Sequence, residues 1–194
     1  GDIATYKMPE FTYTEIDEPE DWIVAESLMK KFILKDKTPD FSKIKIFLSD
    51  VDGVLTDAGM YYTENGDEFK KFCTYDGMGF QLLQKTGIKV GILTTEDREL
   101  NRRRAKKLGL DFDFHGAKDK LQIVKDLCEK ENVSLDEIAY IGDDVNCFEL
   151  LSNAGVSACP INAVSKIKSI PNIIQLKRNG GDGVVREFVE IILS

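Results

Sequence analysis

The sequence predicts an α/β fold, a doubly wound (Rossmann-like) parallel sheet with helices on both faces. From residue 44 onward, short apolar runs typical of buried strands alternate with longer stretches of helical periodicity. Two of these runs end directly in acidic residues, as expected where the carboxyl ends of parallel strands form a binding crevice. We expect strands over residues 44–49, 88–94, 111–115, 138–142, 155–158 and 172–176.

The composition indicates a soluble protein with a substantial core and an acidic surface. Hydrophobic residues make up 42% of the 194 residues, and no apolar run approaches the length that spans a bilayer. The formal net charge of −8 disfavours nucleic acid or an anionic membrane as a partner, because both require a basic face. The cysteines show neither CxxC spacing nor a zinc pattern, so we expect reduced thiols and a cytoplasmic location.

Residues 1–40 differ in character from residues 41–194, and we expect them to form a helical extension and a linker ahead of the main domain. Residues 16–29 predict one helix, with Asp17 or Glu18 as N-cap and a proline in the first turn. Residues 35–40 predict the linker. The start of the helix resembles the tail of acylneuraminate cytidylyltransferases, in which an Ile-Asp-x-Pro-Glu-Asp helix closes the nucleotidyltransferase domain. An ordinary amphipathic surface helix explains the same pattern equally well.

The first expected strand runs directly into Asp50 and Asp52, which are followed by Gly53. At the end of a buried parallel strand, these carboxylates can face one reactive centre while their backbone offers a carbonyl to a metal. Two acidic residues in a solvated turn are the alternative. The run from Ile46 to Asp57 resembles the first motif of the haloacid dehalogenase superfamily, most of whose members are phosphohydrolases that form an aspartyl-phosphate.

Residues 59–72 predict a β-hairpin flap, since Asn65-Gly66 stands between two alternating, aromatic-rich arms. An isolated two-stranded ribbon with exposed aromatic side chains is marginal in water, so we expect it to pack against a partner. The intervals between the superfamily motifs leave no room for the large cap domain that many members carry. In the capless branch that the chain resembles, tetramer formation closes the site, which implies a homotetramer here.

The second and third motifs of the superfamily follow in order. Thr94 ends the second expected strand and supplies the hydroxyl of motif two, and it also suits the N-cap of a helix over residues 96–107. The resemblance points to Lys120 as the lysine that neutralises phosphate and nucleophile, with Lys118 as the lesser candidate. A solvated surface lysine is the alternative for either position.

The fourth motif ends the strand expected over residues 138–142, where Asp143 has the position of the family's Mg²⁺ ligand. The resemblance therefore implies a Mg²⁺ site formed by Asp50, the backbone carbonyl of Asp52, and Asp143. It also implies that Asp50 is the nucleophile and that Asp52 serves as general acid and then as general base.

Two positions depart from this resemblance. Close relatives have glycine where this chain has Thr95, and often aspartate where it has Cys147, which we expect to be a small packing residue. His115, the only histidine, is expected to pack or to support the site from a distance rather than to act in catalysis.

The helix after Thr94 carries the residues that bear on substrate choice. Arg104 and Lys107 are three positions apart and share one helical face, although charged helix faces are commonly just solvated. The segment resembles the branch that dephosphorylates nine-carbon ulosonic acid 9-phosphates, which implies that Glu96, Arg104 and Lys107 contact the sugar acid. The glycine-rich residues 177–183 resemble that branch and its eight-carbon sister, and a turn that caps the final helix explains them equally well.

These observations predict a Mg²⁺-dependent phosphatase acting on a phosphorylated sugar acid of nine carbons. Two alternatives remain at this stage. One is a phosphatase of the eight-carbon 3-deoxy-manno-octulosonate 8-phosphate, and the other is a non-catalytic tetramerising domain of an acylneuraminate cytidylyltransferase.

Overall fold

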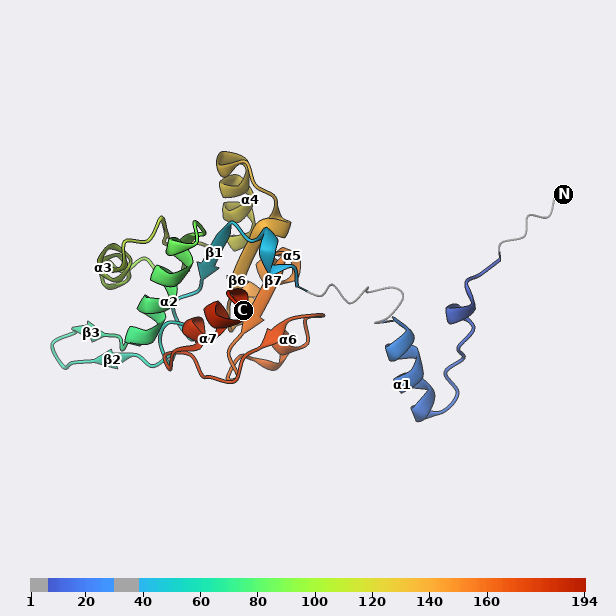
Figure 1. Cartoon of the computed structure of the whole chain (residues 1–194). Coiled ribbons are helices and arrows are strands. Elements are labelled where there is room, and N and C mark those ends of the chain that lie inside the picture. Colours follow the sequence, from blue (N-terminus) through green and yellow to red (C-terminus); the bar gives the residue numbers. More distant parts are fainter. Residues whose placement is uncertain (1–6, 30–38) are drawn as a thin grey trace. The chain divides into compact units, whose positions relative to one another are not determined.

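The structure is a computed structural model that describes residues 7–29 and 39–194. The chain divides into two compact units, Gly1–Thr38 and Pro39–Ser194 (Figure 1). The first unit contains the 3-10 turn η1 (Glu10–Thr12) and helix α1 (Pro19–Leu28). The predicted helix is present, but over a shorter range than residues 16–29. A capping box between Glu18 and Asp21 fixes its start. Most of the linker expected over residues 35–40 lies outside the described residues.

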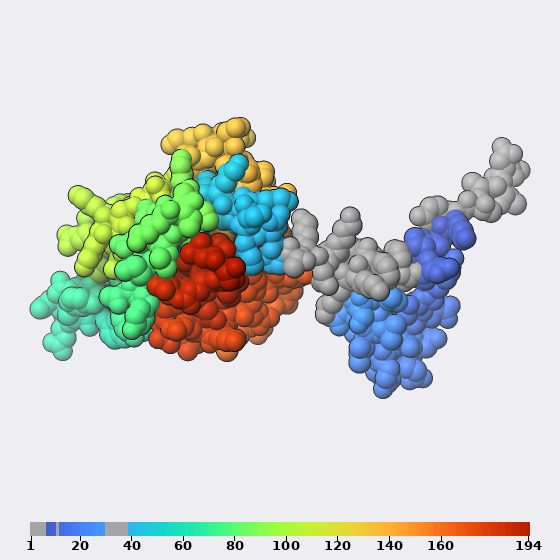
Figure 2. All heavy atoms as spheres, viewed as in Figure 1, coloured from blue at the N-terminus to red at the C-terminus, as the bar shows by residue number. Residues whose placement is uncertain are grey.

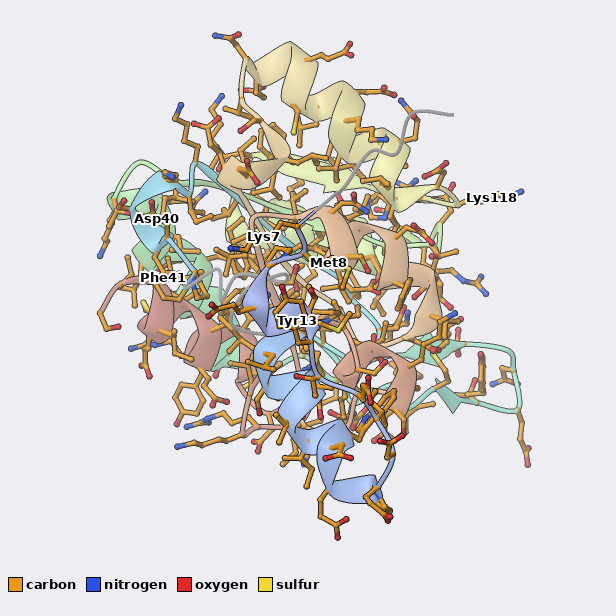
Figure 3. The ribbon with its side chains drawn as sticks, turned by 90° about the vertical axis from the view of Figure 1, so that its right-hand side faces the viewer. Lys7, Met8, Tyr13, Asp40, Phe41 and Lys118 are labelled. Atoms are coloured by element: carbon orange, nitrogen blue, oxygen red, sulfur yellow. The ribbon has the colours of Figure 1, made fainter. Side chains whose placement is uncertain are left out.

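Local hydrogen bonds order the segment that precedes α1. The hydroxyl group of Tyr13 donates to the backbone carbonyl of Met8 at 3.0 Å, and both residues are labelled in Figure 3. Thr12 similarly donates its hydroxyl hydrogen to the carbonyl of Pro9 at 2.7 Å.

The second unit is built on one six-stranded parallel sheet, which confirms the predicted fold class. The strand order is β5-β4-β1-β6-β7-β8, so the chain extends the sheet on one side of β1 before crossing to the other side. Each predicted strand is present, shortened by one or more residues in most cases. The strands are β1 (Ile46–Ser49), β4 (Lys89–Leu93), β5 (Phe112–Phe114), β6 (Ile138–Ile141), β7 (Val156–Cys159) and β8 (Ile174–Gln175).

Two apolar layers hold helices against the two faces of this sheet. Phe47 of β1 packs in one layer with helices α2 and α7, which contact each other. Its neighbours Ile46 and Leu48 point into the other layer with α4, α5 and α6, as the alternation of side chains along a strand requires. The helices are α2 (Thr74–Lys85), α3 (Glu99–Leu108), α4 (Lys120–Glu131), α5 (Phe148–Asn153), α6 (Ser165–Lys168) and α7 (Val184–Ile192). Three 3-10 turns complete the unit: η3 (Phe41–Lys43), η4 (Leu135–Glu137) and η5 (Val145–Cys147).

The predicted hairpin is present as β2 (Tyr61–Tyr62) and β3 (Glu68–Phe69), which pair antiparallel. Figure 2 shows it projecting from the surface of the second unit. Tyr61 and Tyr62 remain 53% and 65% exposed, and Phe69 beside them is also exposed. None of the helices in the described parts of the chain is long and apolar enough to cross a membrane.

Candidate active site

The predicted site residues converge at the carboxyl edge of three neighbouring strands. Asp50 follows β1, Thr94 follows β4 and Asp143 follows β6, and β1 lies between the other two strands. A pocket of about 300 Å³ opens at this edge, where parallel α/β sheets bind their ligands. Its lining consists of Asp50, Asp52, Ala58, Met60, Thr94, Thr95, Glu96, Asp143, Asp144 and Asn146.

Asp50 is held rigidly at the base of this pocket and is only 4% exposed. Its backbone N–H donates to the carbonyl of Ile141 at 3.0 Å, which ties the end of β1 to β6. One carboxylate oxygen, Oδ1, accepts the N–H of Val51 at 2.7 Å, and the other, Oδ2, accepts the ammonium of Lys120 at 2.6 Å. A buried carboxylate fixed in this way is oriented for attack on an electrophile.

Lys120, rather than Lys118, supplies the cation of the site. It is the first residue of α4, is 2% exposed, and lies beneath the pocket against Asp50. Burial is the largest single influence and disfavours its charge, but the charge of Asp50, the hydrogen bond to it and the contact with Cys147 together outweigh that cost and raise the pKa of Lys120 above its usual value. Lys118 is exposed, and Figure 3 shows its side chain pointing outward.

Cys147 packs in the buried core, as expected, and its sulfur also contacts the residues beneath the pocket. It ends η5, and its Sγ lies 2.8 Å from Asp50 Oδ2 and 3.3 Å from Lys120 Nζ. The hydroxyl of Tyr140 lies 3.2 Å from the same sulfur and 3.3 Å from Lys120 Nζ. Burial and the nearby charge of Asp50 raise the pKa of the Cys147 thiol to about 12. The turn from β6 into α5 carries this side chain back onto β1, which sequence spacing does not reveal.

Asp52 is linked to Glu96 by Lys70, a residue that the sequence did not single out. Lys70 follows β3 at the base of the hairpin, and its side chain is fully buried. Its ammonium donates to Asp52 Oδ1 at 2.7 Å and pairs with the carboxylate of Glu96. Burial opposes its charge, but the two carboxylates outweigh burial and raise the pKa of Lys70. For Asp52, burial dominates over the opposing effect of Lys70, and its pKa is raised.

Asp143 and the loop after Asp52 fit closely together. A side chain at Gly53 would collide with the Asp143 carboxylate, so glycine allows this carboxylate to approach the loop. Burial, followed by the charges of Asp50 and Asp144, raises the pKa of Asp143 to about 7. Converging carboxylate oxygens of this kind are a donor set that suits a hard divalent cation.

Thr94 is buried at the end of β4, and its Oγ1 accepts the N–H of Glu96 at 3.2 Å. This bond turns the loop, and α3 begins only at Glu99, so the prediction that Thr94 caps a helix over residues 96–107 is wrong. The oxygen acts as the acceptor, which leaves the hydroxyl hydrogen available to a group in the pocket. Thr95 also lines the pocket, and its Oγ1 accepts a hydrogen bond from Asn146 at 3.1 Å.

The structure does not bring Arg104 and Lys107 into the pocket of their own chain. Arg104 packs over the ring of Phe72 at 5.3 Å and donates to the carbonyl of Cys73 at 3.0 Å. Lys107 is exposed on α3. Of the three predicted substrate contacts, only Glu96 lines the pocket.

His115 lies outside the lining of the site pocket, whereas the glycine-rich residues 177–183 contact the loop after Asp50. His115 is nearly buried, pairs with Asp113 on the edge strand β5, and is absent from the pocket lining. Gly181 donates to the carbonyl of Val54 at 2.8 Å, and a side chain at Gly180 would collide with the backbone of Gly53. The glycine-rich tail therefore packs on the loop that follows Asp50, and Gly183 at its end is the N-cap of α7.

Comparison with known proteins identifies the family. The model of the haloacid dehalogenase-like hydrolases matches residues 74–155. The chain is 35% identical over 151 residues to the 3-deoxy-D-manno-octulosonate 8-phosphate phosphatase of Haemophilus influenzae, covering 78% of this chain and 83% of that protein. The chain belongs to the haloacid dehalogenase-like hydrolases. The predicted family and the predicted class of enzyme, a phosphoric monoester hydrolase, are thereby confirmed.

Two further comparisons place this hydrolase among its relatives. The crystal structure of the 3-deoxy-D-manno-octulosonate 8-phosphate phosphatase of Moraxella catarrhalis, in complex with magnesium, phosphate and the KDO molecule, superposes with a TM-score of 0.75 at 35% identity. The match covers 79% of this chain and 89% of that one. N-acylneuraminate cytidylyltransferase B of Danio rerio is 31% identical over 199 residues, which cover 100% of this chain and 46% of that protein.

Proposed function

We propose that this hydrolase is a Mg²⁺-dependent phosphatase that removes the phosphate of a nine-carbon ulosonic acid 9-phosphate through an aspartyl-phosphate. The observation that carries the proposal is the Asp50–Lys120 pair beneath a pocket that also contains Asp52 and Glu96. Its sequence and structural relatives support the broader assignment, a sugar-acid phosphatase.

Asp50, the backbone carbonyl of Asp52, and Asp143 would hold Mg²⁺. The fit rests on the two converging carboxylates and on the absence of a side chain at Gly53, and a relative contains magnesium. When bound, Mg²⁺ supplies positive charge that offsets the repulsion between a carboxylate and a phosphate.

In the proposed reaction, an Asp50 oxygen attacks phosphorus in line as the bond from phosphorus to the sugar oxygen breaks. Asp52 gives its proton to that sugar oxygen. Asp52 then takes a proton from the water that attacks the aspartyl-phosphate, which releases phosphate and regenerates Asp50. Lys120 and the hydroxyl of Thr94 neutralise and orient the phosphoryl group during both steps.

Glu96 supports the nine-carbon substrate, because it adds a hydrogen-bond acceptor for sugar hydroxyl groups to the lining of the pocket. The eight-carbon 8-phosphate is the second candidate, and it fits the relatives at least as well, because several of them are named for that activity. Contacts of Arg104 and Lys107 with substrate remain a prediction.

A third candidate is a non-catalytic domain of a cytidylyltransferase. Its support is the match to the Danio rerio protein across the whole chain, including residues 1–40, together with the departures at Thr95 and Cys147. Under this candidate, residues 1–40 are the tail of the preceding cytidylyltransferase domain and residues 41–194 are a phosphatase-like domain that holds a homotetramer together.

A phosphate-release assay with both sugar-acid phosphates tests these candidates. We expect a higher kcat/KM with the nine-carbon 9-phosphate, and we expect Glu96→Gln to lower that value while affecting the eight-carbon substrate little. A preference for the eight-carbon 8-phosphate would assign the chain to the sister branch. Release of phosphate from neither substrate by a folded protein with Mg²⁺ would favour the non-catalytic domain.

A further inference from the structure

We propose that the pocket also binds a thiophilic divalent cation such as Zn²⁺ or Cd²⁺, through the carboxylates of Asp50 and Asp143 and the thiolate of Cys147. This ion would compete with Mg²⁺ and occupy the nucleophile. The inference takes the Mg²⁺ position from the proposed function, and it adds a ligand that Mg²⁺ does not use.

The three ligands come from separate parts of the fold and meet at one point. Asp50 follows β1, Asp143 follows β6 and Cys147 ends η5, and one ligand atom from each lies within 4.8 Å of the other two. In the described parts of the chain, this is the one group of three such side chains that converges in this way. Ligand atoms of a tetrahedral zinc site lie about 2.0 to 2.3 Å from the ion and therefore roughly 3.5 Å from one another, so these side chains need to shift by only about 1 Å to surround a single ion.

Cys147 makes the site selective between hard and soft ions. Magnesium takes oxygen ligands and would leave the thiol protonated, whereas zinc and cadmium favour thiolate sulfur. On binding the softer ion, the thiol gives its proton to water and its sulfur lone pair forms the bond to the metal. A carboxylate at this position would offer both kinds of ion the same hard ligand.

The charges around the sulfur favour the same conclusion. With the thiolate, the three ligands carry three negative charges, and the ammonium of Lys120, 3.3 Å from the sulfur, offsets one of them. A thiophilic dication therefore leaves this buried cluster neutral, which avoids the cost of a net buried charge. Mg²⁺ with a protonated thiol leaves one positive charge, which suits an incoming phosphate dianion. The site with Mg²⁺ therefore attracts the phosphate dianion, whereas the site with the softer ion carries no net charge to attract it.

Cadmium titration of the full chain in Mg²⁺-free buffer tests the proposal, because Cd²⁺ bound to thiolate absorbs in the ultraviolet. We expect the absorption to saturate at about one Cd²⁺ per chain. Both Cys147→Ser and Cys147→Ala should lose it, and calorimetry should show Cd²⁺ affinity about 10-fold or more weaker in these variants. The matched control is Cys73→Ser, which replaces a half-buried cysteine outside the cluster and should keep the signal.

Excess Mg²⁺ should weaken the apparent affinity for Cd²⁺ in the wild-type chain, because the two ions share Asp50 and Asp143. Three results would each overturn the proposal: no thiolate absorption in the wild type, absorption that persists in folded Cys147→Ala, or Cd²⁺ binding indifferent to Mg²⁺. Thermal unfolding of each variant establishes that it is folded. Since no turnover is measured, the outcome is independent of whether the chain hydrolyses sugar-acid phosphates.

Discussion

Replacing Lys70 by methionine tests how the hairpin contributes to the site. Lys70 lies between Asp52 and Glu96, and its ammonium contacts both carboxylates. Methionine has a similar length and keeps the apolar stem in place, but it removes the charge. Because the proposed substrate is an anion, it would then meet two carboxylates without their shared cation.

The expected size of the effect follows from the burial of the groups. Loss of one partner from a buried, hydrogen-bonded charge pair costs about 2–5 kcal/mol. The side chains of Asp52 and Glu96 are 31% and 37% exposed, so solvent screening places the effect at the lower end. A loss of about 2 kcal/mol corresponds to a roughly 30-fold fall in kcat/KM, and we expect most of it in KM.

Steady-state phosphate release with a sugar-acid phosphate at low ionic strength measures this effect. Lys71→Met is the matched control, since Lys71 is the exposed neighbour and carries the same charge. With the eight-carbon 8-phosphate, for which Glu96 itself is expected to matter little, the double variant Lys70→Met/Glu96→Gln should recover part of the loss, because it removes one of the two unpaired carboxylates. Equal kinetics for Lys70→Met and Lys71→Met would refute the reasoning, as would a double variant no better than Lys70→Met alone.

Three further predictions address the nucleophile, the hairpin and the core. Asp50→Asn should abolish turnover while retaining a folded protein, and EDTA should stop the wild-type enzyme; phosphate release that survives either change would contradict the proposed chemistry. Replacing Tyr61 and Tyr62 by aspartate should convert the expected tetramer to smaller species in light scattering and lower activity with it, whereas a fully active monomeric wild type would argue against closure by a partner. Asp76 is 1% exposed, and burial raises its pKa from 3.8 to about 6. The unfolded chain therefore loses this proton at lower pH than the folded chain, and the contribution of Asp76 to stability falls as pH rises between these values. Urea unfolding should show Asp76→Asn gaining up to about 3 kcal/mol relative to wild type from pH 4 to pH 7, and a pH-independent difference would disprove the assignment.

The order of strands along the chain could be predicted because each signal is local. A few consecutive apolar residues before Asp50 and before Asp143 were enough to predict two strands. The Asn65-Gly66 pair was enough to predict the hairpin. The same runs placed Asp50, Thr94 and Asp143 at strand ends, and parallel pairing brought those ends together. The start of α3 was predicted wrongly because the hydroxyl of Thr94 accepts the N–H of Glu96 within a loop. The spacing of apolar residues does not reveal such a turn.

The sequence by itself determined the fold class, the family, and the residues whose chemistry follows from their place at strand ends. Only the tertiary structure decided that Lys120 is buried against Asp50, that Lys70 joins Asp52 to Glu96, and that the Cys147 thiol also contacts Asp50. These contacts join residues 18 to 97 positions apart, so they depend on how the hairpin and the turn after β6 fold back over the sheet. Periodicity specifies which face of an element is buried, but it carries no information about which distant side chain meets it there.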